Sequence, residues 1–201
     1  MRNKLEIFSF KLVFMADVGE VLQVAILGNP VLRKIAEPVA EPTSDEITTL
    51  AHSLVKTMIH NHGSGIAAPQ VSISKRVIIY RITPERAATE NTDPYPISCL
   101  VNPELEFLTE EKRVGWEGCL SVPGIKGKVE RCNKIRYRGY NPLTREHVDS
   151  IAEGFLARVL QHEVDHLDGL MFIDRSDSKD LTFATQLHFH TNWIDRPHEA
   201  K

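Results

Sequence analysis

Apolar residues recur at helical spacing in two separate stretches of the chain. In the first stretch, a capping-box spacing at Thr43 and Glu46 precedes the repeat, and the run Asn61-His62-Gly63 ends it. The repeating apolar positions are Ile47, Leu50, Leu54 and Met58. This pattern predicts an amphipathic helix over residues 44–61.

The second stretch predicts a helix over residues 153–167, followed by Gly169, a residue that suits a helix C-cap. Its apolar stripe is formed by Leu156, Leu160, Val164 and Leu167. Earlier in the chain, short runs rich in β-branched and aromatic residues predict strands. These strands lie at 77–80, 99–101 and 134–140, with a partner around 147–151 after the turn at Asn141-Pro142.

Two proline-bearing segments separate these elements. Residues 28–43 contain three Xaa-Pro pairs, which predicts an extended segment along the surface with at most one short turn of helix. Residues 84–96 are polar, which predicts a surface loop that packs little. Strands followed by one late helix indicate an α+β architecture with a mixed sheet.

Composition narrows the class of protein. The chain has 201 residues, 42% of them apolar, which is enough for one domain with a sizeable core. A net charge of -3 and a pI near 6.3 give no general attraction to nucleic acid or to an anionic membrane, so we expect neither as a partner. The three cysteines (Cys99, Cys119 and Cys132) are too few for a disulfide framework, and a reducing, cytoplasmic setting fits best.

The amino-terminal stretch bears on localisation. Residues 1–14 place Arg2 and Lys4 ahead of apolar residues, as a secretory signal would, but Lys11 interrupts the run and no small-residue cleavage pattern is evident. We expect an added arm or an early start codon ahead of Met15, and neither export nor organellar targeting. No apolar run approaches the ~20 residues that a bilayer requires.

The predicted second helix carries a motif with chemistry, His162-Glu163-Val164-Asp165-His166. Its two imidazoles lie four residues apart on one helix face, where both can bind one cation, and Glu163 lies beside them. A divalent metal lowers the pKa of bound water to about 7, and a neighbouring carboxylate can take the proton. An ordinary amphipathic helix with surface His and Glu is the alternative. The motif taken alone favours a metal-dependent hydrolase.

The identity and position of the third metal ligand distinguish the known classes of metal site that contain HExxH. Phe172 stands where a metzincin has its third histidine, and the only glutamate after His166 is Glu199, so metzincin and thermolysin-like sites are excluded. Three downstream histidines lie in a weakly periodic tail, where a solvated or edge position is expected: His188, His190 and His198. Upstream, Cys119 is the best available donor, although most lone cysteines are buried and inert, and the residues alone slightly favour that interpretation.

Taken together, three motifs in order resemble the peptide deformylase family. They are Gly63-Ser64-Gly65-Ile66-Ala67-Ala68-Pro69-Gln70, Glu117-Gly118-Cys119-Leu120-Ser121 and Gln161-His162-Glu163-Val164-Asp165-His166. The resemblance spans about residues 20–175. It implies a single α+β domain in which mixed or antiparallel sheets pack around the helix that carries HExxH. Residues 1–19 then form an amino-terminal extension and residues 176–201 a carboxy-terminal tail.

The resemblance also implies residue roles. One divalent metal, natively ferrous iron with zinc, nickel or cobalt accepted, would be held by Cys119, His162 and His166. Glu163 would act as general base and acid on a metal-bound water nucleophile. The Gln70 side chain and the Leu120 backbone N–H would donate hydrogen bonds to the formyl oxygen, and the substrate would contact Gly63, Gly65 and Ile66.

The implied reaction removes the formyl group from formyl-methionine at the amino terminus of nascent polypeptides and releases formate. A transient ribosome contact is expected with it. For Glu117 we expect a hydrogen bond that holds the metal-site loop, for Trp116 a packing role, and for Arg158 an outward-facing, salt-bridged position rather than a place at the rim of the methionine pocket. The rival hypotheses are a metallopeptidase that cleaves internal peptide bonds and a deformylase-like protein that keeps the site for binding alone.

Overall fold

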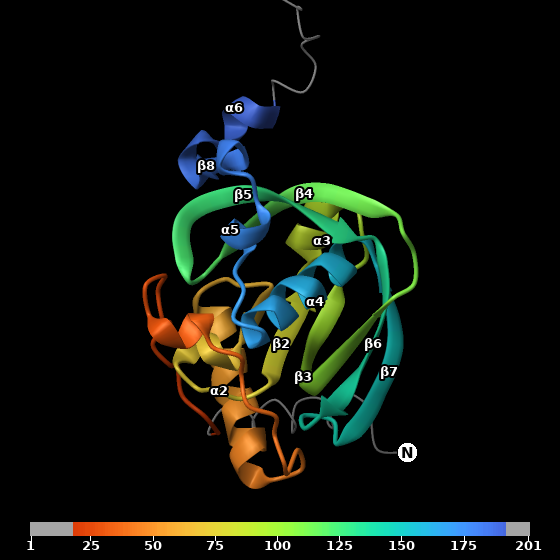
Figure 1. The fold of residues 1–201 in the computed structure, drawn as a ribbon. Helices are drawn as coiled ribbons and strands as arrows, with labels where there is room; N and C mark the ends of the chain where they lie inside the picture. The colour runs from red at the N-terminus through yellow and green to blue at the C-terminus, as the bar shows by residue number, and fades with distance from the viewer. Residues whose placement is uncertain (1–17, 192–201) are drawn as a thin grey trace, which may run out of the picture.

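The protein has an α+β fold built on two antiparallel sheets, as expected from the sequence (Figure 1). The computed structural model describes residues 18–191, so the predicted amino-terminal arm at 1–14 lies outside the described part. The larger sheet has the strand order β1-β2-β3-β6-β7. Its strands are β1 (Gly65–Ala67), β2 (Val77–Ile82), β3 (Tyr95–Phe107), β6 (Lys134–Asn141) and β7 (Glu146–Glu153). The predicted strands all fall within this sheet.

The smaller sheet has the order β4-β5-β8, and none of its strands was predicted from the sequence. Its members are β4 (Lys112–Cys119), β5 (Val122–Cys132) and β8 (Leu181–Phe183). β4 and β5 pair over nearly their full length, and the register shifts between Gly118 and Cys119. β8 pairs with β5 from within the predicted carboxy-terminal tail. The segment around Cys119, expected to be a loop, is therefore the end of a strand.

The first predicted helix is α2 (Asp45–His60), and its apolar face is buried. Leu54 and Met58 are fully buried against Val77 and Ile79 of β2. The helix is capped by Ser44, whose hydroxyl accepts a hydrogen bond from the Ile47 backbone N–H at 3.3 Å. The expected capping box at Thr43 is thus wrong by one residue.

The second predicted helix is α4 (Gly154–Leu167), at the centre of the molecule with strands of both sheets around it (Figure 1). Ala157, Leu160 and Leu167 are fully buried, and Leu160 packs with Ile78 of β2. Gly169 follows the helix with φ +73°, the left-handed conformation that glycine adopts most easily. α2 and α4 thus cover opposite faces of β2, which explains why residues 77–80 of that strand are buried on both faces.

Residues 84–96 do not form the predicted loop. They contain α3 (Pro84–Glu90), which is capped by Thr83 and buries Ala87. Over 28–43 the only helix is the short 3₁₀ turn Pro30–Arg33, as predicted. The remaining helices near the carboxyl end are α5 (Phe172–Arg175) and α6 (Leu187–Thr191), with 3₁₀ turns at Ser178–Asp180 and Ala184–Gln186. A further 3₁₀ turn, Ala68–Val71, follows β1. Within residues 18–191 no helix is long and apolar enough to cross a membrane.

Candidate metal centre and its pocket

Three of the predicted side chains converge between the two sheets. Cys119 lies at the end of β4, and His162 and His166 lie one turn apart on α4. Their donor atoms all lie within 4.8 Å of one another, and Cys119 Sγ is 3.2 Å from His166 Nε2. A thiolate and two imidazole nitrogens at such separations match the donor set of a single transition-metal ion. The residues present therefore fit the expected metal.

A buried carboxylate orients one of these histidines. Glu117 Oε2 accepts a hydrogen bond from His162 Nδ1 at 2.8 Å, so the other ring nitrogen, Nε2, is left for the cluster. Arg131 donates to both oxygens of Glu117 at 2.9 Å and also pairs with Asp165. Glu117 was expected to hold the metal-site loop through a hydrogen bond, whereas in the structure its carboxylate contacts His162.

Ionisation within the cluster follows from these contacts. Burial disfavours the Cys119 thiolate, but His166 and His162 outweigh it and lower the pKa of the thiol well below its usual range. Burial likewise opposes charge on His162, but contacts with Cys119 and Glu117 raise the pKa of the imidazole. The pKa of Glu117 is lowered despite burial, because His162 and Arg131 donate to its carboxylate. The cluster thus favours a thiolate, the form that binds metal.

Glu163 lies beside the cluster and is 4% exposed. Its Oε2 atom has no hydrogen-bond partner among the described residues, although it is buried. Burial raises the pKa of this carboxyl to about 7, an effect that His162 and His166 oppose. Gly65 makes room for it, because a Cβ added there would lie 2.2 Å from Glu163 Oε1. A buried carboxylate oxygen without a hydrogen-bond partner, beside three convergent donors, indicates a site that binds a ligand.

Gln70 approaches the cluster from the opposite side. Its Oε1 atom accepts a hydrogen bond from the Ala67 backbone N–H at 2.8 Å, which fixes the orientation of the amide. Its Nε2 group therefore points at Cys119 Sγ, 3.3 Å away, and at Ser121 Oγ, 3.2 Å away. With 2% exposure this side chain is well placed to donate a hydrogen bond to a small polar group beside Cys119.

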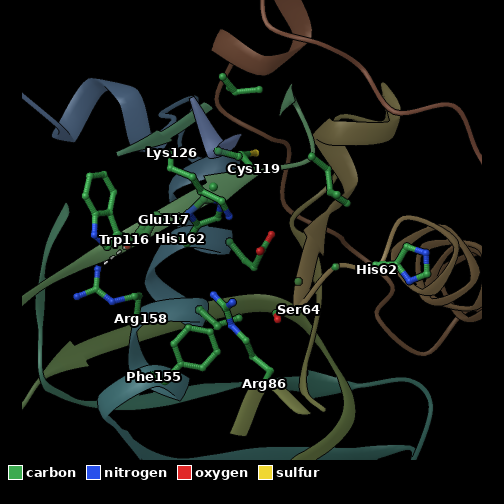
Figure 2. Close-up of a pocket in the computed structure, with 18 of the residues that line it drawn as sticks. His62, Ser64, Arg86, Trp116, Glu117, Cys119, Lys126, Phe155, Arg158 and His162 are labelled. Atoms are coloured by element: carbon green, nitrogen blue, oxygen red, sulfur yellow. Dashed lines mark hydrogen bonds and ion pairs between the residues drawn. The ribbon is translucent and has the colours of Figure 1, made fainter. Parts of the chain in front are cut away.

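A pocket of about 490 Å³ opens onto the cluster (Figure 2). Gly63, Gly65 and Leu120 line it, as the predicted contacts to substrate require. Ile66 does not: its side chain is fully buried in the core beneath α2, so only its backbone is left for the predicted contact. Trp116, expected only to pack, lines this pocket and stacks edge-on against His190 of α6.

Arg158 does not face outward as predicted. Its side chain is only 11% exposed and also lines the pocket, although its expected salt bridge is present, to Glu117 Oε1 at 2.8 Å. Arg131 was missed altogether, because a charged residue on an unpredicted strand gives no signal of burial. Within the described residues, His188 and His190 are not part of the donor cluster, and His198 lies outside them.

Comparison with known proteins connects this site to a family. A family model for polypeptide deformylases matches residues 21–182. The chain is 40% identical to peptide deformylase 1 of Prochlorococcus marinus, over 85% of this chain and 87% of that protein. It is 45% identical to the peptide deformylase of Halothermothrix orenii, over 77% and 93%.

A solved structure gives the same result. The class I type b peptide deformylase from Acinetobacter baumannii, bound to Met-Ala-Ser, superposes with a TM-score of 0.70 and 42% identity. The match covers 77% of this chain and 98% of that one. The family match at 21–182 includes Gln70, Cys119 and the whole of α4, and it ends before α6 begins.

Proposed function

The chain belongs to the polypeptide deformylase family, and on that premise we propose that it removes the formyl group from formyl-methionine at the amino terminus of newly made polypeptides, releasing formate. The family is metal-dependent. One observation carries the proposal most directly: the unpartnered buried carboxylate of Glu163 lies beside the convergent Cys119, His162 and His166.

These three side chains are the proposed metal ligands. A divalent ion held there, ferrous iron by family resemblance, would polarise the formyl carbonyl and lower the pKa of a water to about 7. Zinc, nickel and cobalt suit a thiolate and two imidazoles as well. The Glu117 carboxylate on His162 Nδ1 supports this assignment, because a hydrogen bond to Nδ1 leaves Nε2 as the nitrogen that would bind an ion.

Glu163 is the proposed general base and acid. Its Oε2 atom is free to accept a proton from the attacking water and to pass it to the departing amine nitrogen. One carboxylate then serves both halves of the reaction. Gly65 leaves the space that the other oxygen occupies, because a Cβ at position 65 would lie 2.2 Å from Glu163 Oε1.

Gln70 and Leu120 are the proposed donors to the formyl oxygen. The Gln70 amide is held by Ala67, so its Nε2 group is already oriented toward the space beside Cys119. The backbone N–H of Leu120, the residue after Cys119, would supply the second hydrogen bond. Donors that are oriented before the reaction contribute about 3 to 4 kcal/mol each when charge develops on the oxygen.

The pocket supplies a place for the methionine side chain. Phe155 and Val159, one turn apart on α4, line it with apolar surface next to His162. The Met-Ala-Ser peptide bound by the Acinetobacter baumannii relative supports a methionyl peptide as the occupant. Backbone contacts from Gly63 and Gly65 would align the peptide, and a transient ribosome contact would bring it to the enzyme.

Formate release from a formyl-Met-Ala peptide tests the proposal, with the ferrous protein purified without oxygen. We expect formate in amounts equal to the free amine produced. An endopeptidase would instead cleave casein internally, and a protein that uses the site only for binding would retain the formyl peptide intact. Either result, without formate, would overturn the proposed function.

A further inference from the structure

A second cavity, here called the rear cavity, lies on a different face of α4 from the metal centre. It has a volume of about 550 Å³, and among the described residues it shares no lining residue with the pocket at the metal centre. A volume of this size is typical of small-molecule sites, which span about 300–1,000 Å³. The residues that α4 contributes recur at helical spacing and so form one face: Gln161, Val164, Asp165 and Asp168.

One wall of the rear cavity is apolar. Leu105 and Phe107 lie two positions apart on β3, so their side chains are on the same face of the sheet, and Val164 lines the cavity with them. Phe107 is paired with Ile135 of β6, which is fully buried, yet Phe107 itself is 65% exposed. Apolar and aromatic side chains around a cavity with a few polar groups are the usual lining of a ligand site.

Two arginines supply the polar groups. Arg175 donates to both oxygens of Asp165 through Nε and Nη2, each at 2.6 Å, and Arg76 donates to Asp168 through Nη1 at 2.8 Å. Among residues 18–191, the Nη1 group of Arg175 and the Nη2 group of Arg76 have no hydrogen-bond partner. Asp165 also pairs with the buried Arg131, so it neutralises Arg175 only in part.

The geometry points to a small anion with an apolar tail. We propose that the rear cavity binds a monocarboxylate that carries an unbranched alkyl chain. A carboxylate suits the planar donor fork of an arginine, and the chain would lie against Leu105, Phe107 and Val164. Asp165 and Asp168 line the same cavity, and their charge would repel a dianion such as phosphate. The inference does not depend on the proposed function.

Titration calorimetry with octanoate tests the inference on the full chain loaded with Ni²⁺. An excess of Met-Ala-Ser is present throughout, to fill the pocket at the metal centre. The wild type should bind octanoate at least about tenfold more tightly than acetate, because acetate lacks the chain that is removed from water. Inorganic phosphate should not compete. Octylamine, with the same chain and the opposite charge, should not bind.

Arg175→Gln tests the carboxylate end of the site. The affinity for octanoate should fall by about tenfold, since a hydrogen bond to a charged group has an effect of that order. Asp165 keeps Arg131 as a partner in this variant. Arg136→Gln is the matched control: Arg136 also donates through Nε and Nη2 to one aspartate, Asp149, and its side chain is 41% exposed against 43% for Arg175. Octanoate affinity should stay at the wild-type value in the control.

Phe107→Ala tests the apolar wall independently. It should weaken octanoate by about tenfold and leave the affinity for acetate unchanged, because only the longer chain reaches the ring. Phe183→Ala on β8 is the control, since Phe183 is also 65% exposed but does not line the rear cavity. The exposed position of Phe107 keeps this variant informative should Arg175→Gln fail to fold.

Three results would overturn the inference. The first is a wild type that does not bind octanoate. The second is an affinity that is unchanged in folded Arg175→Gln and Phe107→Ala but falls in Phe155→Ala, which would place octanoate in the pocket at the metal centre. The third is displacement of octanoate by phosphate, which would contradict a site for monoanions. Failure of formate release would overturn the proposed function and leave the result at the rear cavity unaffected.

Discussion

At the scale of single residues, Glu163 gives the sharpest test of the proposed chemistry. Glu163→Gln keeps the shape of the side chain but removes its capacity to carry a proton, so kcat should fall by about 10²- to 10⁴-fold. Metal content should stay at the wild-type level, because Glu163 is not among the three convergent donors. Steady-state kinetics with metal analysis measures both, and Glu130→Gln on the exposed side of β5 is the control. Loss of metal with activity preserved would contradict the assigned role.

Gly65 offers a second test that leaves every polar group in place. Gly65→Ala puts a Cβ where Glu163 Oε1 now lies, so the carboxylate must move. A displacement of about 1 Å in a catalytic group reduces the rate by roughly 100-fold, and we expect a loss of that size in kcat/KM. Glu163→Ala with and without Gly65→Ala is the control, since a Cβ at position 65 has no carboxylate to displace in that background and should leave kcat/KM unchanged. Wild-type activity in Gly65→Ala alone would mean that Glu163 has room elsewhere.

The convergence of the three candidate metal ligands was predictable from the sequence, whereas the contacts that support them were not. Cys119, His162 and His166 were expected from the resemblance, and the structure brings their donor atoms together. Arg158 and Arg131 were misjudged or missed, since a sequence places arginine outside by default. Their burial depends on acceptors from distant strands, such as Glu117, and those contacts exist only after folding.

At the scale of elements, the N-cap of α2 tests the predicted capping box at Thr43 against the Ser44 cap of the structure. Ser44→Ala removes the oxygen that accepts from the Ile47 N–H, and the free energy of unfolding should fall by about 1 kcal/mol. Thr43→Ala should change it by much less. Urea denaturation of both variants measures the difference. A larger decrease in the free energy of unfolding for Thr43→Ala than for Ser44→Ala would mean that Thr43 caps the helix, as the sequence predicted.

The elements that escaped prediction share a physical reason. β4 and β5 carry glycines and charged residues, which are weak strand formers, and their pairing with each other supplies what local propensity lacks. α3 is short and polar, and it is fixed by the Thr83 cap and by Arg86 lying over Phe155. The long periodic helices and the apolar strands were predicted well because the spacing of their apolar residues indicates which face is buried.

At the scale of the whole molecule, the proposed metal would join the two halves of the fold. Cys119 belongs to the smaller sheet, and His162 and His166 belong to α4, which packs on the larger sheet. Removing the metal should therefore lower the Tm, and Ni²⁺ should restore it in a concentration-dependent way. At 100 times the dissociation constant a bound ion adds about 2.7 kcal/mol.

Calorimetry of chelator-treated protein with added ions measures this effect. Mg²⁺ is the control, because it prefers oxygen ligands and should leave the Tm unchanged. A Tm that does not respond to Ni²⁺ would mean that the three donors do not bind the ion in the folded protein.

The burial of β2 between α2 and α4 has a consequence for how the molecule opens. Val77 and Ile79 face one helix while Ile78 and Tyr80 face the other, so no local fluctuation can bare this strand without separating a helix from the sheet. Its backbone amides should exchange with deuterium only through global unfolding, whereas those of the three-residue edge strand β8 should exchange far sooner. Hydrogen exchange followed by mass spectrometry would rank the two. α4 packs against the strand that we expect to be the most protected, so His162 and His166 should keep their positions during the small openings that loosen the rim of the pocket.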